Sequence, residues 1–225
     1  MTRRPDAVAF DVIETLFPIE PLSGGIEALG LPKQVLQTWF AASLRDSFSL
    51  AAIGAFQPLR AVMEANLDDL LARYGRTAPL AAKTALLDSM ATLPPHADAA
   101  EAIKVLTGAG LRVLALSNGG AEATESLLRG AGLREKVDPV VTTTEVGISK
   151  PRQEVYLHAA QRAGVEPDRL MLVATHPWDT NGAKAAGLMA GYVARGRPYP
   201  AILKAPDVQR DSLADIAQGI ISMTA

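Results

Sequence analysis

The second half of the chain alternates between short apolar runs and segments with helical periodicity, and this alternation restricts the fold more than any other feature. It predicts strands at residues 112–116, 137–142, 170–174 and 189–194, and helices at about 97–109, 121–131, 152–164 and 179–187. A glycine stands at the end of each of these helices, where a left-handed residue commonly follows the last turn. Strands that alternate with helices form a parallel sheet with helices on both faces. The sequence therefore predicts an α/β fold.

The first part of the chain adds one strand and a long helical segment. The apolar run at residues 7–10 ends at Asp11 and predicts a strand of the same sheet. From residue 18 to residue 93, apolar side chains recur at helical spacing. Pro94-Pro95 ends this pattern, because proline disfavours the helical conformation in the residue before it. We therefore expect a core domain of residues 1–17 and 94–225, interrupted after its first strand by a helical domain of residues 18–93.

The composition excludes several kinds of site and partner. The 225 residues include no cysteine and only three histidines, which rules out thiolate metal sites and a cysteine nucleophile and disfavours a multi-histidine metal site. A formal net charge of −2 gives no basic surface for nucleic acid or anionic membranes. No apolar run approaches the roughly 18 residues that a bilayer-spanning helix needs. We therefore expect a cytoplasmic protein without nucleic-acid or membrane partners.

Polar side chains follow four of the predicted strands. Asp11 and Thr15 come after the first strand, Ser117 and Asn118 after the second, Lys150 after the third, and Asp179 after the fourth. Each residue by itself is an ordinary capping or turn residue. In an open parallel sheet, however, ligands bind beyond the carboxyl ends of the strands. The sequence therefore predicts that these side chains form one site at that edge.

In order and spacing, these motifs resemble those of the haloacid dehalogenase-like hydrolases. The matching segments are Phe10-Asp-Val-Ile-Glu-Thr-Leu16, Ser117-Asn118-Gly119, Lys150-Pro151, and Trp178-Asp179 followed by Gly182-Ala183. The resemblance covers nearly the whole chain. It implies a Rossmann-like core with a parallel sheet, and it identifies the inserted helical segment as a cap domain.

The resemblance also implies a role for each catalytic residue. Asp11 is the expected nucleophile, which forms a covalent ester or acyl-phosphate. Thr15 and Ser117 are expected to hold its carboxylate by hydrogen bonds. Lys150 is expected to keep Asp11 ionised and to compensate charge in the transition state. Asp179 is expected to orient Lys150, and the hydrolytic water is a second candidate for its contact.

Two positions separate the phosphatases of this family from its dehalogenases. The phosphatases carry a general acid two residues after the nucleophile, where this chain has Ile13, and a metal-binding Asp where it has Thr175. Isoleucine delivers no proton, and a hydroxyl is a poor substitute for a carboxylate beside Mg²⁺. A halide leaving group needs no protonation. The resemblance is therefore strongest to the metal-independent L-2-haloacid dehalogenases, which convert an (S)-2-haloacid into an (R)-2-hydroxy acid without a cofactor.

The substrate-binding residues expected from the resemblance include two departures from it. Asn118, Tyr156 and Trp178 match dehalogenase positions. Trp39-Phe40 lies at or near the position where those enzymes carry a halide-binding Arg. Arg45, further along the same predicted helix, either replaces that Arg in the substrate site or forms a surface salt bridge with the neighbouring Asp46. His176 replaces an Asn, and an imidazole there can position or deprotonate the hydrolytic water. Glu14, where the family usually has Gly, has no explanation in the sequence.

Two other interpretations remain open from the sequence. One is a small-molecule phosphatase with an altered metal site. The other is a catalytically silent protein that binds a ligand through the inherited pocket. The presence of Asp11, Lys150 and Asp179 argues against a silent protein, and the missing halide-binding Arg argues for one. The resemblance also implies a homodimer formed through the cap helices.

Overall fold

The structure, a computed structural model that describes residues 3–224, contains a six-stranded sheet in which all neighbouring strands run parallel. The spatial order is β3-β2-β1-β4-β5-β6, and the strands are β1 (Ala7–Phe10), β2 (Arg112–Ser117), β3 (Val140–Thr142), β4 (Leu170–Ala174), β5 (Met189–Val193) and β6 (Val208–Arg210). The direction of winding reverses between β1 and β4. In parallel α/β sheets, ligands bind beyond the carboxyl ends of the strands at such a reversal. Asp11, directly after β1, lies at this point.

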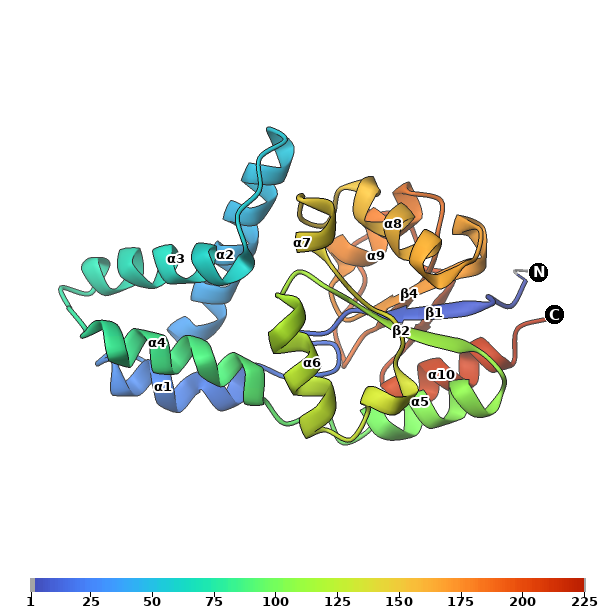
Figure 1. Ribbon diagram of the computed structural model, residues 1–225, viewed down its shortest axis with the longest axis horizontal. Coiled ribbons are helices and arrows are strands. Elements are labelled where there is room, and N and C mark those ends of the chain that lie inside the picture. The colour runs from blue at the N-terminus through green and yellow to red at the C-terminus, as the bar shows by residue number, and fades with distance from the viewer. Residues whose placement is uncertain (1–2, 225) are drawn as a thin grey trace.

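Helices cover both faces of the sheet (Figure 1). One face carries α5 (Ala99–Gly108), α6 (Ala121–Gly130) and α10 (Leu213–Ile221), and the other carries α7 (Thr143–Val146), α8 (Gln153–Ala163) and α9 (Pro177–Ala185). In β1, Val8 and Phe10 belong to the first core and Ala7 and Ala9 to the second, and all four are fully buried. Because successive side chains of a strand point to opposite faces, a strand covered on both faces needs an unbroken apolar run.

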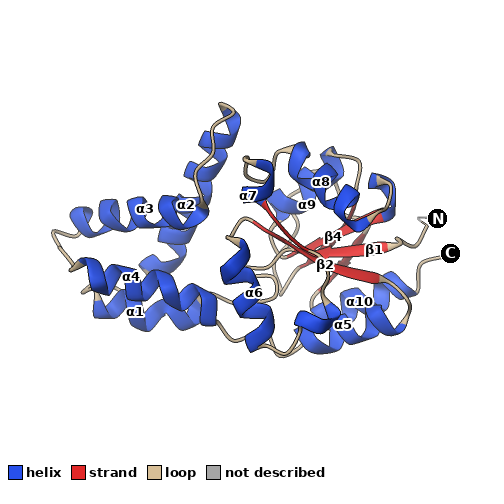
Figure 2. Ribbon diagram, viewed as in Figure 1, coloured by secondary structure: helices blue, strands red, loops and turns tan. Residues whose placement is uncertain are grey.

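Four helices between β1 and α5 form a lobe beside the sheet (Figure 2). They are α1 (Ser23–Ala28), α2 (Val35–Ala52), α3 (Leu59–Arg73) and α4 (Leu80–Ser89). Helices α2 and α3 pack together, and the Trp39 indole Nε1 donates a hydrogen bond of 2.9 Å to the Met63 carbonyl. This segment is helical as expected, and the predicted domain boundaries at residues 18 and 93 remain a prediction. Short 3-10 turns connect the longer elements: η1 (Glu20–Leu22), η2 (Met90–Thr92), η3 (Arg134–Lys136) and η4 (Pro167–Arg169).

The structure differs from the expected elements in three places. The short helix α7 follows β3, where no helix was expected. Strand β3 begins at Val140 rather than at residue 137. The preceding Pro139 has no backbone N–H to donate to the sheet, which explains the later start. No element was expected beyond residue 194, whereas β6 and α10 follow there. Among the helices of residues 3–224, none is long and apolar enough to cross a membrane.

Candidate active site

The carboxylate of Asp11 lies among hydrogen-bond donors from other parts of the sheet edge. Its Oδ2 accepts a hydrogen bond of 2.7 Å from Thr15 Oγ1, and its Oδ1 accepts one of 3.1 Å from Lys150 Nζ. The Thr15 hydroxyl in turn accepts from the backbone N–H of Thr175 over 3.0 Å, which joins the loop after β1 to the end of β4. Burial alone would raise the pKa of Asp11, but the Lys150 charge and a hydrogen bond to His176 hold it below its ordinary value. The carboxylate is therefore ionised, as a nucleophile must be.

Lys150 is fully buried between two carboxylates. Its Nζ also donates to Asp179 Oδ2 over 2.8 Å, and the Tyr156 hydroxyl donates to Asp179 Oδ1 over 2.6 Å. Burial lowers the pKa of Lys150, but the charges of Asp11 and Asp179 outweigh burial and raise this pKa above its ordinary value. Lys150 thus stays protonated, and both oxygens of Asp179 are occupied by donors. This geometry agrees with the expectation that Asp179 orients Lys150.

Tyr156 is placed behind the nucleophile, supporting Asp179, and does not line a cavity beside Asp11. The expectation that it contacts substrate is therefore corrected. Gly182 in α9 makes its position possible, because a Cβ at Gly182 would lie 2.6 Å from the Tyr156 hydroxyl oxygen. A glycine, one turn after the Asp179 motif, lets the tyrosine approach that carboxylate.

Asp11 faces a small cavity between the cap helices and the core. Beyond Asp11, the lining residues are Phe40, Leu44 and Leu59 from the cap, and Ile13, Ser117, Asn118, Gly119, His176 and Trp178 from the strand ends. Thr15, Lys150 and Asp179 do not line this cavity. Thr15 and Lys150 hold the carboxylate from behind, and Asp179 holds Lys150. Among the lining side chains, Asp11 and His176 are the only titratable ones.

The His176 ring bridges Asp11 to a second carboxylate. Its Nδ1 lies 3.4 Å from Asp11 Oδ2, and its Nε2 lies 2.7 Å from Glu14 Oε2. Glu14 Oε1 accepts a further hydrogen bond of 3.2 Å from Gln37 of α2. Burial lowers the pKa of His176, but the hydrogen bonds to Asp11 and Glu14 outweigh burial and raise this pKa to about 9. The ring is therefore an imidazolium at neutral pH.

Glu14 stands where the resembled family usually has Gly, and its carboxylate is the partner of His176 Nε2. Its backbone φ is 65°, in the left-handed region. Residues other than glycine occupy such regions at a cost on the order of 1–3 kcal/mol, and such residues cluster at functional sites. The two departures from the resembled family, a Glu in place of Gly and a His in place of Asn, thus contact each other.

Ser117 is at the site but does not hold the nucleophile as expected. Its Oγ accepts a hydrogen bond of 2.9 Å from the Gly119 backbone N–H, and within residues 3–224 it makes no hydrogen bond to Asp11. Serine hydroxyls often bond in this way to the backbone two residues on, which shapes the turn after a strand. Asn118 Oδ1 accepts from the Lys150 backbone N–H over 3.1 Å and fixes the loop that carries the lysine.

Of the three aromatic side chains expected near the substrate, Phe40 and Trp178 line the small cavity and Tyr156 does not. Phe40 reaches it from α2, and the Trp178 ring stacks on His176 with the ring centroids 5.4 Å apart. Arg45 does not reach it, since its side chain is 66% exposed and pairs with Asp46 over 2.7 Å. Of the two alternatives for Arg45, the structure shows the surface ion pair with Asp46, and the assignment of Arg45 to the substrate site is corrected. Arg45 follows Phe40 by five residues rather than by three or four, so the two lie on different faces of the helix.

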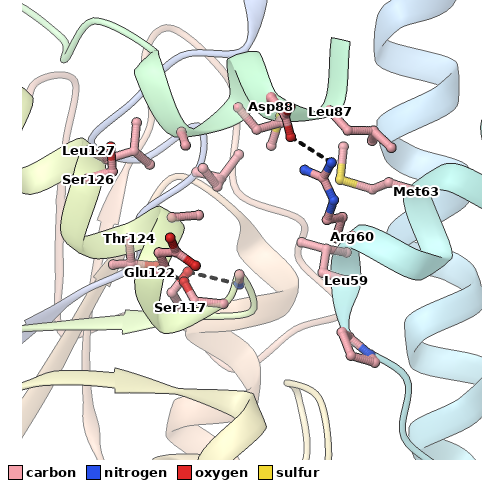
Figure 3. A pocket seen from close by; sticks show the side chains of 17 residues that line it. Leu59, Arg60, Met63, Leu87, Asp88, Ser117, Glu122, Thr124, Ser126 and Leu127 are labelled. Carbon is pink, nitrogen blue, oxygen red and sulfur yellow. Dashed lines mark hydrogen bonds and ion pairs between the residues drawn. The ribbon is translucent and has the colours of Figure 1, made fainter. Parts of the chain in front are cut away.

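A larger cavity of about 560 Å³ adjoins the small one and shares Ile13, Leu59, Ser117 and Gly119 with it. Leu59 and Met63 line it from the cap side, and Ser117 and Leu127 from the core side (Figure 3). Its walls are mostly apolar, and Arg60, which also lines it, pairs with Asp88 over 2.7 Å. The space next to the nucleophile is therefore suited to an apolar group.

The two positions at which phosphatases need carboxylates carry other groups. Ile13 lines both cavities. The Thr175 hydroxyl donates to the Val193 carbonyl over 3.0 Å and accepts from Arg197 over 2.7 Å. Within residues 3–224, no three or more histidine, aspartate and glutamate side chains form a group that could hold a metal ion.

Comparisons of sequence connect this chain to characterised hydrolases. A model of the haloacid dehalogenase-like hydrolases matches residues 5–187. The (S)-2-haloacid dehalogenase 1 of Pseudomonas sp. (strain CBS-3) is 26% identical over 221 residues, which is 97% of each chain. An (S)-2-haloacid dehalogenase of Xanthobacter autotrophicus is 27% identical over 191 residues, 84% of this chain and 75% of the relative.

Solved structures share the fold. The L-2-haloacid dehalogenase from Xanthobacter autotrophicus with chloropropionic acid covalently bound aligns with a TM-score of 0.90 at 23% identity. The alignment covers 98% of this chain and 100% of the other. At this identity the match shows a common architecture of core and cap.

Proposed function

Because the chain belongs to the haloacid dehalogenase-like hydrolases, we propose that it removes halide from an (S)-2-haloacid and releases an (R)-2-hydroxy acid. The observation that carries this proposal is the ionised Asp11, held from behind by Lys150 and Thr15 and facing a cavity whose lining contains no second carboxylate. The names of the relatives, (S)-2-haloacid dehalogenases over most of the chain, support it.

In the first step, a carboxylate oxygen of Asp11 attacks C2 of the haloacid from the side opposite the halogen. The new C–O bond forms as the C–halogen bond breaks, and the halide leaves with the bonding electrons. The configuration at C2 is inverted in this step. Because halide leaves without a proton, the reaction needs no general acid at the position of Ile13, where phosphatases have one. Ser117 and Asn118 line the cavity and supply polar contacts for the substrate carboxylate.

In the second step, water attacks Cγ of Asp11 in the ester. The bond between Cγ and the ester oxygen breaks, so the C2–O bond and its inverted configuration survive into the product. The cation of Lys150, 3.1 Å from Oδ1, stabilises negative charge that develops on the carbonyl oxygen. Asp11 returns to its carboxylate form.

We propose that this turnover needs neither a metal nor a cofactor. Thr175 provides no carboxylate for Mg²⁺, and its hydroxyl is already bonded to Val193 and Arg197. Ile13 provides no proton for the leaving group of a phosphate ester. Phosphoryl transfer depends on metal ions to neutralise charge. These residues therefore favour carbon–halogen chemistry over a phosphatase.

The larger cavity supports a broader choice of substrate than the shortest haloacid. A group on C2 that extends from Asp11 past Leu59 enters the apolar space lined by Met63 and Leu127. We propose that this space accepts the alkyl chain of 2-haloalkanoic acids longer than chloropropionate. A homodimer formed through the cap helices and a cytoplasmic location remain predictions, and light scattering in solution checks the first.

The decisive experiment is halide release from L-2-chloropropionate, with the D enantiomer, EDTA and added Mg²⁺ as controls. We expect release from the L enantiomer alone, unchanged by EDTA. Asp11→Asn should abolish it, because an amide is a far weaker nucleophile than a carboxylate. Magnesium-dependent phosphatase activity of ordinary efficiency would refute the proposal, and so would a protein that binds the acid without releasing halide.

A further inference from the structure

Hydrolysis of the Asp11 ester requires a group that takes a proton from water. Asp179 is unsuited to this, because it is fully buried behind Lys150 and does not line the small cavity that Asp11 faces. Lys150 is a buried cation and has no lone pair to offer. The water must reach Cγ through the small cavity, where His176 is the one titratable side chain among the lining residues apart from Asp11 itself.

Building on the proposed function, we infer that Glu14 and His176 form a catalytic pair in which His176 Nδ1 takes the proton of the water that attacks the Asp11 ester, while Glu14 holds Nε2. The geometry assigns the two ring nitrogens different tasks. Nε2 lies 2.7 Å from Glu14 Oε2 and keeps its hydrogen there, whereas Nδ1 lies 3.4 Å from Asp11 Oδ2 on the cavity side. His176 is the catalytic residue of the pair, and Glu14 is a positioning residue that acts through it.

Formation of the ester itself converts His176 into a base. In the free enzyme two carboxylates face the ring and raise its pKa to about 9, so the ring holds both protons. Esterification removes the charge of Asp11 and leaves Glu14 as the only anion bonded to the ring, which lowers this pKa. The Nδ1 proton then leaves to solvent, and Nδ1 becomes available as a base. The protein thus keeps an imidazolium beside the nucleophile during attack and a neutral imidazole during hydrolysis.

The proton balance closes over one turnover. Water adds to Cγ and gives a proton to Nδ1, and the tetrahedral intermediate then expels the alkoxide of the hydroxy acid, which takes that proton back from Nδ1. Asp11 is left as a carboxylic acid and transfers its proton to Nδ1, which restores the resting ion pair. The single proton released to solvent accompanies the halide.

Other charged groups near the pair come from several elements. Burial raises the pKa of Glu14, but the hydrogen bond and charge of His176 outweigh burial and lower it, with a smaller contribution from the charge of Arg197. Arg197 bonds to Thr175, next to His176. Glu20 shares the Gln37 amide with Glu14, and His96 Nε2 lies 3.1 Å from the Glu14 carbonyl oxygen. Behind Asp11, the remaining charges are Lys150 and Asp179. None of these groups hydrogen-bonds the His176 ring, whose recorded partners are Asp11 and Glu14.

The test separates the two chemical steps by rapid mixing with L-2-chloropropionate, followed by halide assay and intact-protein mass spectrometry. We expect His176→Asn to release about one halide per active site and then to hold the ester, with decay slowed by about 100-fold or more. The halide burst shows that the variant is folded and that the first step is intact. Ester decay at the wild-type rate in His176→Asn would overturn the inference.

The pH profile of ester decay tests Glu14. The decay rate of the wild type should rise with pH through the pKa of His176 in the ester. Glu14→Gln keeps an acceptor for Nε2 but removes the charge, so this midpoint should fall by about 1–3 pH units. Glu20→Gln, the matched control, removes an exposed carboxylate that does not touch the ring and should leave the midpoint in place.

An unchanged midpoint of the pH profile in Glu14→Gln would refute the catalytic pair. This measurement tests the pair even if His176→Asn loses both ester formation and ester decay. A wild-type protein that releases no halide and forms no ester would instead reject the proposed function, and the inference with it.

Discussion

Removal of the buried cation at Lys150 should destabilise the fold. It should also invert the pH dependence of the stability that the neighbouring carboxylates contribute. Lys150→Met keeps the length of the side chain but leaves Asp11 and Asp179 without the Nζ that now lies 3.1 and 2.8 Å from their oxygens. Breaking a fully buried ion pair by removing one partner costs about 3–5 kcal/mol. For a chain of this size, 1 kcal/mol corresponds to about 2–4 °C in Tm, so Tm should fall by about 6–20 °C at neutral pH.

The sign of the pH effect follows from the direction of the pKa shift. In the wild type the folded-state pKa of Asp11 is lowered, so its contribution to stability is present above the unfolded pKa and is lost as pH falls through the folded pKa. Burial already raises the pKa of Asp179 in the wild type. Without Lys150, burial and the mutual repulsion of the two carboxylates raise the pKa values of both Asp179 and Asp11 above those of the wild type. Their contribution is then present below the unfolded pKa of about 3.9 and is lost as pH rises through the raised pKa.

Thermal unfolding of both proteins between about pH 4.5 and pH 8 measures this directly, because the raised carboxyl pKa values lie in or near that window. The difference in Tm between the wild type and Lys150→Met should be largest at pH 8 and should shrink toward pH 4.5. Lys104→Met serves as the control, since Lys104 is exposed and lies 3.9 Å from Glu101 on the helix surface. If Lys150→Met has the same Tm as Lys104→Met, and its Tm does not approach that of the wild type toward pH 4.5, the proposed electrostatic role of the lysine is wrong.

Three further variants test other parts of the site. Arg45→Ala should leave both kcat/KM for halide release and Tm unchanged, because the side chain is exposed; a large loss of kcat/KM would return Arg45 to the substrate. Ala123→Phe should narrow the larger cavity. It should reduce kcat/KM about tenfold or more for 2-bromohexanoate but little for 2-chloropropionate, since each buried methylene contributes about 0.8 kcal/mol. Equal losses for both acids would contradict the assignment of this cavity to the alkyl chain of the substrate. Gly182→Ala should lower kcat and Tm by displacing Tyr156, whereas Gly24→Ala, with open space around its Cβ, should not.

The parts of this fold that were predictable from the sequence are those set by local patterns. Strands β1 and β4 occupy the predicted residues, because apolar runs covered on both faces admit no other placement. The glycines predicted to end four helices, Gly110, Gly132, Gly164 and Gly187, all have positive φ. The alternation of strands and helices also predicted that Asp11, Lys150 and Asp179 meet at one edge, and ion pairs of 3.1 and 2.8 Å join them.

The parts that were not predictable depend on the direction of individual side chains. Arg45 and Phe40 share α2, but only the packing of that helix shows which of them faces the cavity. Tyr156 follows Lys150 by six residues, and its hydroxyl turns behind Asp179 because Gly182 leaves room there. The hydroxyl of Ser117 could bond either to Asp11 or to the backbone of its own turn, and spacing does not determine which. In the structure it accepts from the Gly119 N–H.

Glu14 and His176 show how a contact changes the meaning of two sequence departures. Position by position, each replaces a residue that the family resemblance leads one to expect, and neither has a partner nearby in the sequence. The neighbouring placement of β1 and β4 brings the residues that follow these strands together, and the left-handed φ of Glu14 accompanies a 2.7 Å contact between its carboxylate and the imidazole. An imidazole without Glu14 would have a lower pKa and a free Nε2, and the half-buried Glu14 carboxylate without His176 would lack its cation. The two changes therefore compensate each other in stability, and a single replacement at either position is expected to lower Tm by more than the double replacement by Gly and Asn does.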